Sequence, residues 1–346
     1  MQLDELNVSL DSALVERYKQ EGYLLLNGLI TSQWLDRLRG VANEFVEASR
    51  SLEQSSKAID IAPGHTSAQP KLRRLVSPVD MHPTFHEFAL QGPIAQLACA
   101  LLGGSARFHH SKLNYKWSSG GEEVKWHQDI QFWPHTDFSP LTIGVYLDAV
   151  DDEMGPMGVI PGSHQGQLYD LYDDQGQWAG AMQDDDIEQL DLDKVVWLKG
   201  DAGSVTIHNA CMIHGSIPND SDRGRPLLLQ TYSAIDSYPI GCLGANSALG
   251  GASGTVIQGP SDQHLSVQGR ELKCAPDWSA SAGRAPTIFG SQQRQKFLFW
   301  LLLKTKALIL AALKDKGFYL WLREKNTAKG LATRSIDSKT HIKEAP

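Results

Sequence analysis

Two residues with the chemistry of metal ligands stand close together, His127 and Asp129, in the stretch Lys125-Trp126-His127-Gln128-Asp129-Ile130. In an extended strand, side chains two positions apart project to the same face, so the imidazole and the carboxylate would both point inward. They form two corners of the 2-His-1-carboxylate arrangement that binds Fe(II). Many proteins contain His-x-Asp by chance, and a surface pair is the alternative, so the pattern requires a second histidine from a distant strand.

His214 can supply this histidine. It lies 87 positions after His127 and follows an expected strand at 204–208, so the two ligands would come from separate strands. Three protein ligands leave open positions on an octahedral metal, as the binding of O2 and a bidentate cosubstrate requires. His208 is an alternative distal ligand, although its place within a strand fits core packing or support of a ligand better.

An arginine follows at the start of the next expected strand. Arg225 lies eleven residues after His214, within Arg223-Gly224-Arg225-Pro226. A guanidinium binds both oxygens of a carboxylate, so Arg225 is expected to hold one end of 2-oxoglutarate while the other end chelates the metal. Arg223 competes for this role, because a shift of two residues keeps the same strand face.

Four motifs in this order resemble the phytanoyl-CoA dioxygenase family over about residues 21–236. They are Trp126-His127-Gln128-Asp129, Pro161-Gly162-Ser163-His164, His214-Gly215-Ser216-Ile217-Pro218-Asn219 and Arg225, with Gly22-Tyr23 and Lys116 as further points of similarity. The family consists of Fe(II)- and 2-oxoglutarate-dependent oxygenases. The resemblance therefore implies a mainly β fold, a double-stranded β-helix of the jelly-roll or cupin type with flanking α-helices.

The resemblance also implies roles for individual residues. His127, Asp129 and His214 would ligate Fe(II), and Arg225 would bind 2-oxoglutarate with help from Ser216. Three further residues stand where other members place cosubstrate contacts: Lys112, Asn114 and Thr142. Some relatives have an aromatic residue near Gly144 beside the cosubstrate, and this chain has none, which leaves that wall of the pocket undefined.

Composition limits the class of protein. The 346 residues are 41% hydrophobic and 21% charged, which is ordinary globular material, and the net charge of −8 argues against nucleic-acid binding. The four cysteines show no CxxC pairing and the N-terminus resembles no signal peptide, so a cytosolic protein with reduced thiols is expected. No apolar run reaches the ~20 residues of a membrane span.

The chain is expected to form one oxygenase domain over 1–346. Helices and first strands should occupy 1–105, including helical patterns at 14–22, 32–46 and 83–102, with a loop at 51–70. Short β-like runs at 106–116, 125–132, 141–149, 158–160, 195–198, 203–208 and 226–235 should build the core at 106–236. Residues 237–290 are rich in Gly and Ser and predict a long loop, with a lid over the site and a subunit contact as its alternative roles.

The C-terminal part carries a different pattern. Residues 291–325 hold two apolar runs, Phe297–Leu303 and Ala307–Leu313, and predict a helical segment, while 326–346 form a polar tail. This segment is expected to pack on the barrel or on a second subunit of a homodimer, and a helix lying on a membrane surface is the less favoured alternative.

The expected activity is oxidation of a small-molecule substrate by O2 and 2-oxoglutarate at Fe(II), with release of succinate and CO2. Hydroxylation is favoured over halogenation, because halogenating relatives have a small residue where Asp129 stands. Desaturation and ring formation stay open, as does the identity of the substrate. A cupin-like metal- or ligand-binding protein without turnover is the main alternative, and a zinc hydrolase is weaker because it would give Arg225 no purpose.

Overall fold

A computed structural model of the chain describes residues 12–117, 123–240, 250–258, 264–267 and 269–273. The chain divides into two units, Met1–Ala275 and Pro276–Pro346, and every described residue belongs to the first. The expected helical segment at 291–325 and tail at 326–346 lie outside the described residues. These expectations and the single-domain organisation therefore stay predictions.

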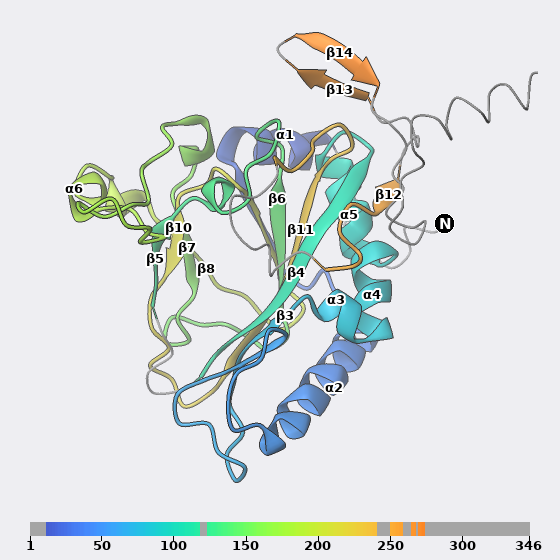
Figure 1. Cartoon of the computed structure of the whole chain (residues 1–346), viewed down its shortest axis with the longest axis vertical. Coiled ribbons are helices and arrows are strands. Elements are labelled where there is room, and N and C mark those ends of the chain that lie inside the picture. The colour runs from blue at the N-terminus through green and yellow to red at the C-terminus, as the bar shows by residue number, and fades with distance from the viewer. Residues whose placement is uncertain (1–11, 118–122, 241–249, 259–263, 268, 274–346) are drawn as a thin grey trace, which may run out of the picture. The chain divides into compact units, whose positions relative to one another are not determined.

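The first unit begins with helices, continues with antiparallel strands and ends with a hairpin (Figure 1). The helices are α1 (Ser12–Glu21), α2 (Ser32–Ala48), α3 (Pro78–Met81), α4 (Pro83–Leu90), α5 (Pro93–Leu101) and α6 (Asp184–Ile187). The first strands are β1 (Tyr23–Leu26), β2 (Ile59–Ile61), β3 (Leu72–Val76), β4 (Ala106–Lys116), β5 (Val124–His127), β6 (Leu141–Tyr146) and β7 (Met157–Val159). The later strands are β8 (Val196–Leu198), β9 (Val205–Asn209), β10 (His214–Ser216), β11 (Arg225–Ala234), β12 (Val256–Gln258), β13 (His264–Val267) and β14 (Arg270–Lys273).

The largest sheet has the order β1-β9-β6-β11-β4-β3-β2, with β12 paired to the far end of β4. In its centre, β6-β11-β4, side chains alternate between the two faces, with one interruption where the register of β4 and β11 shifts between Thr231 and Tyr232. Ile143 and Leu113 belong to the hydrophobic core, whereas Thr142 and Lys112, their chain neighbours, line a cavity on the opposite face. The alternation therefore separates a structural face from a functional one.

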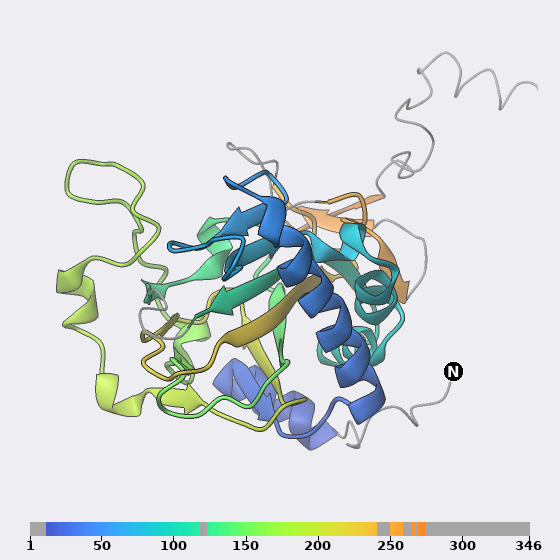
Figure 2. The same ribbon diagram turned by 90° about the horizontal axis from the view of Figure 1, so that it is seen from below.

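Helices cover the structural face of the large sheet, as Figures 1 and 2 show for α2, α4 and α5. Trp34 and Leu38 of α2 and Phe85 and Phe88 of α4 are buried in the same cluster as the inward residues of the sheet. Thr31 caps α2 by accepting a hydrogen bond from the backbone N–H of Trp34 at 3.4 Å, which fixes where this helix begins.

A second sheet, of order β5-β10-β7-β8, supplies the other side of the fold. Two antiparallel sheets of this kind confirm the expected jelly-roll class. Three expectations from the sequence were incomplete. The stretch 83–102 forms two helices, because Pro93 starts a new one after Gly92. The expected loops at 51–70 and 237–290 contain strands, β2 in the first and β12, β13 and β14 in the second.

The described residues contain no helix that could cross a membrane. Cys99 and Cys211, the two cysteines among them, are free and buried, as expected for reduced thiols.

Candidate active site

The two predicted histidine ligands face each other across the small sheet. His127 ends β5 and His214 begins β10, and the two residues are direct partners in the antiparallel register. Their rings lie 4.2 Å apart between centroids. The Nδ1 of His127 is 2.8 Å from the carbonyl oxygen of Lys125, and the Nδ1 of His214 is 3.0 Å from that of Met212. A carbonyl oxygen only accepts, so Nδ1 carries a proton in each ring, and a neutral ring then has its lone pair on Nε2.

Asp129 completes the group from a short turn. The sequence analysis placed it in the same strand as His127, but β5 ends at His127 and Asp129 opens a 3-10 turn, Asp129–Gln131. The same-face relation survives because Gln128 between them is extended, with φ −122° and ψ 129°. The Oδ1 of Asp129 lies 3.6 Å from the Nε2 of His127, and its Oδ2 lies 4.0 Å from the Nε2 of His214.

This geometry fits a metal ion. Among the described residues, His127, Asp129 and His214 form the one group whose ligand atoms all lie within 4.8 Å of one another. Burial and the neighbouring histidines hold the pKa of His214 well below its usual range, so this ring is neutral. Burial acts to raise the pKa of Asp129, yet the imidazoles and Lys112 outweigh it and hold that pKa low. Two imidazoles and a carboxylate that converge in this way favour a cation at their centre.

His208, the alternative distal ligand, lies in the next layer. It stands on β9, and its Nε2 is 3.4 Å from the Oδ2 of Asp129. Its Nδ1 is buried without a hydrogen-bond partner. Donation from Nε2–H to the carboxylate would orient Asp129, which agrees with the supporting role considered from the sequence.

Two buried cations stand side by side at one end of the cavity. Arg225 opens β11 and pairs in register with Lys116, the last residue of β4, and each residue is 5% exposed. The Nη1 of Arg225 donates to the carbonyl of Gly155 at 2.7 Å, while its Nε is buried without a partner. Lys116 donates to the Oγ of Ser216 at 2.8 Å. No carboxylate of the described chain forms an ion pair with either cation, which is the charge pattern of a site for a ligand carboxylate.

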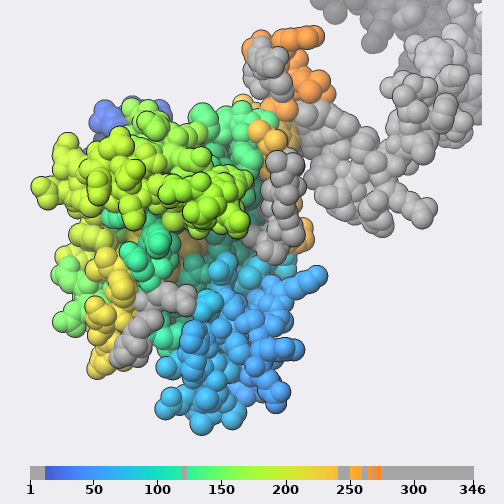
Figure 3. Space-filling model, turned by 60° about the vertical axis from the view of Figure 1, so that its left-hand side comes forward, coloured from blue at the N-terminus to red at the C-terminus, as the bar shows by residue number. Residues whose placement is uncertain are grey.

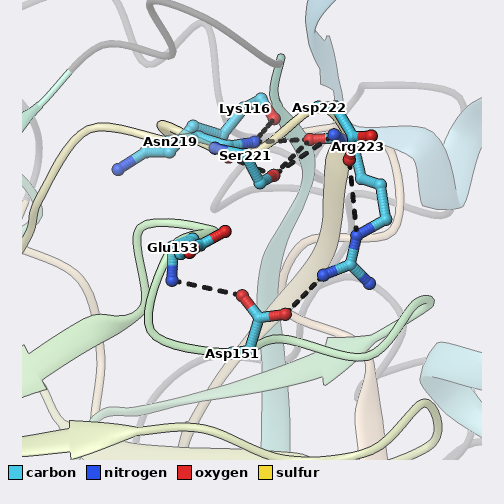
Figure 4. A network of polar contacts seen from close by, with 7 residues as sticks. All are labelled: Lys116, Asp151, Glu153, Asn219, Ser221, Asp222 and Arg223. Atoms are coloured by element: carbon cyan, nitrogen blue, oxygen red, sulfur yellow. Dashed lines mark hydrogen bonds and ion pairs between the residues drawn. The ribbon is translucent and has the colours of Figure 1, made fainter.

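Arg223, the alternative anchor, points elsewhere. Its guanidinium is 53% exposed and forms an ion pair with Asp151 (Figure 4). Its backbone carbonyl accepts hydrogen bonds from Asn219 and Ser221, and Asn219 also donates to the carbonyl of Lys116. This network shapes the turn that leads into Arg225, and of the two candidates only Arg225 lines the cavity.

The other residues predicted to contact the cosubstrate also line the cavity, at different distances from Arg225 along the strands. Asn114 stands opposite Leu227 in the register of β4 and β11, and its Oδ1 is buried without a partner. Lys112 stands two residues further along β4, opposite Leu229. Thr142 lies further still from Arg225, and its hydroxyl hydrogen bonds to that of Thr231 at 2.9 Å. Ser216, Asn114, Lys112 and Thr142 all line the cavity.

The cavity has a volume of about 400 Å³, which suits small ligands. Its wall at Gly144 is closed without an aromatic residue, because Leu227 and Leu229 line it and a Cβ at Gly144 would meet both within 3.2 Å. Arg74 of β3 also lines it and was not predicted, since no strand was expected there. In Figure 3 this side of the molecule is hollowed between the excursion around 167–193 above and the β2–β3 region below.

Comparisons with known proteins agree with this site. The family model for phytanoyl-CoA dioxygenase matches residues 18–227, so the chain belongs to the phytanoyl-CoA dioxygenase family. The probable alpha-ketoglutarate-dependent hypophosphite dioxygenase of Stutzerimonas stutzeri is 37% identical over 174 residues, which cover 49% of this chain and 60% of that protein. The L-proline trans-4-hydroxylase of Streptomyces griseoviridis is 32% identical over 162 residues, covering 41% of this chain and 60% of that protein.

The fold agrees with solved structures. The crystal structure of EctD from S. alaskensis with bound Fe superimposes with a TM-score of 0.56 at 23% identity, covering 66% of this chain and 79% of that one. The matched region spans 60% of the length of each of the two relatives above.

Proposed function

We propose that this protein is an Fe(II)- and 2-oxoglutarate-dependent dioxygenase that hydroxylates an unactivated C–H bond of a small molecule. In the balanced reaction, substrate, 2-oxoglutarate and O2 give hydroxylated substrate, succinate and CO2. The observation that carries the proposal is the joint presence of two features in one cavity. Three ligand atoms lie within 4.8 Å of one another, and Arg225, a buried cation with no carboxylate partner among the described residues, lines the same cavity beside Lys116.

His127, Asp129 and His214 would hold Fe(II), which would supply the oxidising chemistry with O2 and 2-oxoglutarate. Three ligands from the protein leave the remaining positions of an octahedral ion open for both small molecules. The Nδ1–H of each histidine is already held by a carbonyl, so neither ring must turn to bind the ion. This preorganisation lowers the cost of assembling the site.

Arg225 and Lys116 would hold the far carboxylate of 2-oxoglutarate. Ser216, which lies on β10 with His214, accepts a hydrogen bond from Lys116. Asn114, two residues before Lys116 on β4, would contact the body of 2-oxoglutarate with its side chain, whose Oδ1 has no partner within the described protein. The cavity wall of Leu227 and Leu229 would keep water from this part of the site, which protects the reaction from side products.

Asp129 supports hydroxylation over halogenation. Its carboxylate occupies the position between the two histidines, so no protein ligand is missing that a halide would replace. The small cavity and the small molecules in the names of the two relatives, hypophosphite and L-proline, support a small-molecule substrate. Cytosolic location and a homodimer stay predictions.

The test is consumption of 2-oxoglutarate by the purified full chain with Fe(II) in air, followed as succinate formation. Slow turnover without substrate is expected, and it should stop without O2 and in His214→Ala. A non-catalytic binding protein would bind 2-oxoglutarate and form no succinate under any of these conditions, and that outcome would refute the proposal.

A further inference from the structure

Two cationic side chains in the cavity have no part in the proposed binding of metal and 2-oxoglutarate. Lys112 of β4 is partly buried, and Arg74 of β3 is exposed at the cavity. The two strands are neighbours in the large sheet, with Val76 of β3 opposite Lys112. Neither cation forms an ion pair with a residue that the structure describes.

Lys112 stands away from the end of the cavity that holds Arg225. On β4 it lies four residues before Lys116, which is roughly 13 Å along a strand. The charges that act on each lysine differ accordingly: Arg225 and Glu123 act on Lys116, whereas Asp129 and Arg74 act on Lys112. Lys112 therefore faces the metal group and Arg74, and not the anchor of the far carboxylate.

The charges of the cavity do not balance without a further anion. Three cationic side chains line it, Arg74, Lys112 and Arg225, against the single carboxylate of Asp129. Fe(II) and the 2-oxoglutarate dianion cancel each other, so at least two positive charges are left after both bind, and Lys116 beside Arg225 adds to them when it is protonated. A desolvated ammonium next to a divalent ion is costly unless an anion lies with it, because both charges have lost water. Burial, opposed by Asp129, already lowers the pKa of Lys112.

We propose that the substrate is a small anion whose carboxylate or phosphorus oxyanion is bound by Lys112 and Arg74, beside the metal. This inference rests on the proposed function and names the substrate class of the same site. It replaces the expectation from sequence that Lys112 contacts 2-oxoglutarate. Lys112 fixes the anion inside the cavity, and Arg74 attracts it at the rim, where steering by an exposed charge acts on the rate of entry.

The experiment measures binding in the absence of turnover. The full chain, in excess over Mn(II), is saturated with 2-oxoglutarate so that Arg225 and Lys116 are occupied. Propionate, inorganic phosphate and the neutral analogue propionamide are then titrated, and paramagnetic relaxation of their nuclei by Mn(II) reports binding close to the metal. At least one of the two anions should bind about tenfold or more tightly than propionamide, since a buried charge pair contributes strongly. Tighter binding of propionate would assign a carboxylate, and tighter binding of phosphate a phosphorus oxyanion.

Variants separate the substrate role from a cosubstrate role. Lys112→Met should weaken binding of the preferred anion about tenfold or more and leave 2-oxoglutarate affinity unchanged, while Lys112→Arg should retain the anion. Arg74→Gln should weaken it less, because Arg74 is exposed. Lys57→Met, which removes an exposed lysine outside the cavity, is the matched control and should change nothing.

Two results would overturn the inference: equal binding of propionamide and both anions, or loss of 2-oxoglutarate affinity in Lys112→Met as large as the loss of anion affinity. Failure of the unmodified chain to bind Mn(II) and 2-oxoglutarate at all would instead count against the proposed function.

Discussion

Replacement of Arg225 by glutamine tests the cosubstrate site most directly. The side chain is 5% exposed, so a 2-oxoglutarate carboxylate bound to it is shielded from water. Truncating one partner of such a buried charge pair costs about 2–5 kcal/mol, most of it from the charge left unpaired. At about 1.4 kcal/mol per factor of ten, 2-oxoglutarate affinity should fall between about 30-fold and several thousand-fold.

The assay is calorimetric titration of 2-oxoglutarate into the Mn(II)-loaded protein, with metal affinity measured separately. Metal binding should not change, because none of the three metal ligands contacts Arg225 through a hydrogen bond in this structure. Arg223→Gln is the matched control. It also removes a guanidinium, two residues before Arg225, but this one is exposed and forms an ion pair with Asp151. An exposed pair contributes at most about 1 kcal/mol, so the control should stay within roughly fivefold of the unmodified protein. Unchanged affinity in Arg225→Gln, or a larger loss in Arg223→Gln, would refute the assignment.

Three further predictions concern the metal ligand, the support of Arg225 and the lysine beside it. Asp129→Ala should weaken metal binding more than about 100-fold and abolish succinate formation. Mutation of a residue that only supports a metal ligand already lowers metal affinity by about 10–100-fold, so loss of a ligand should lower it further. Full activity of this variant would contradict the assignment. Gly155→Ala should lower stability by roughly 1–3 kcal/mol and weaken 2-oxoglutarate binding, because Gly155 has φ +65° and a Cβ would lie 2.4 Å from the carbonyl oxygen of Ile217. In denaturant titrations Gly176→Ala, with φ +72° and open space around it, should cost less, and equal costs would exclude the steric explanation.

Burial and Arg225 lower the pKa of Lys116 to about 7, and a bound dianion should raise it again. At pH 8 Lys116 should be mostly deprotonated in the free protein and protonated in the complex, so binding of 2-oxoglutarate should take up a proton. The affinity for 2-oxoglutarate should therefore fall as the pH rises from 7 to 9. Calorimetry in buffers of different ionisation enthalpy measures the uptake, which Lys116→Met should remove; equal heats in all buffers would speak against it.

The sequence was most informative where one residue type has one chemical use. His127, His214 and Arg225 were found because imidazoles and a guanidinium at such spacing have few other purposes, and the structure brings them to one cavity. The strand at 106–116 was also predicted with its observed bounds, after the helix end at Gly103-Gly104.

The rest depended on tertiary contacts that no local pattern records. Lys116 was noted only as a point of similarity, and its role became visible when the register placed it opposite Arg225. Arg74 was missed because β2 and β3 are short and lie at the sheet edge, where β3 pairs with β4 and β2 with β3. Asp129 was placed on a strand, yet the chain turns there, since β10 pairs with β5 only as far as His127.

The pairing of His127 with His214 has a consequence for the life of the protein in a cell. The two ligands are 87 residues apart in sequence and meet only after β5 and β10 have paired, so an unfolded chain offers the ion no complete site. An ion that binds only the native state stabilises it by mass action, by about 2.7 kcal/mol at a hundredfold excess over the dissociation constant. We expect a chelator to lower the melting temperature and Mn(II) to restore it, with no such shift in His214→Ala. When metal is scarce, the protein would lose its activity and would also be degraded faster, because proteases degrade the unfolded fraction.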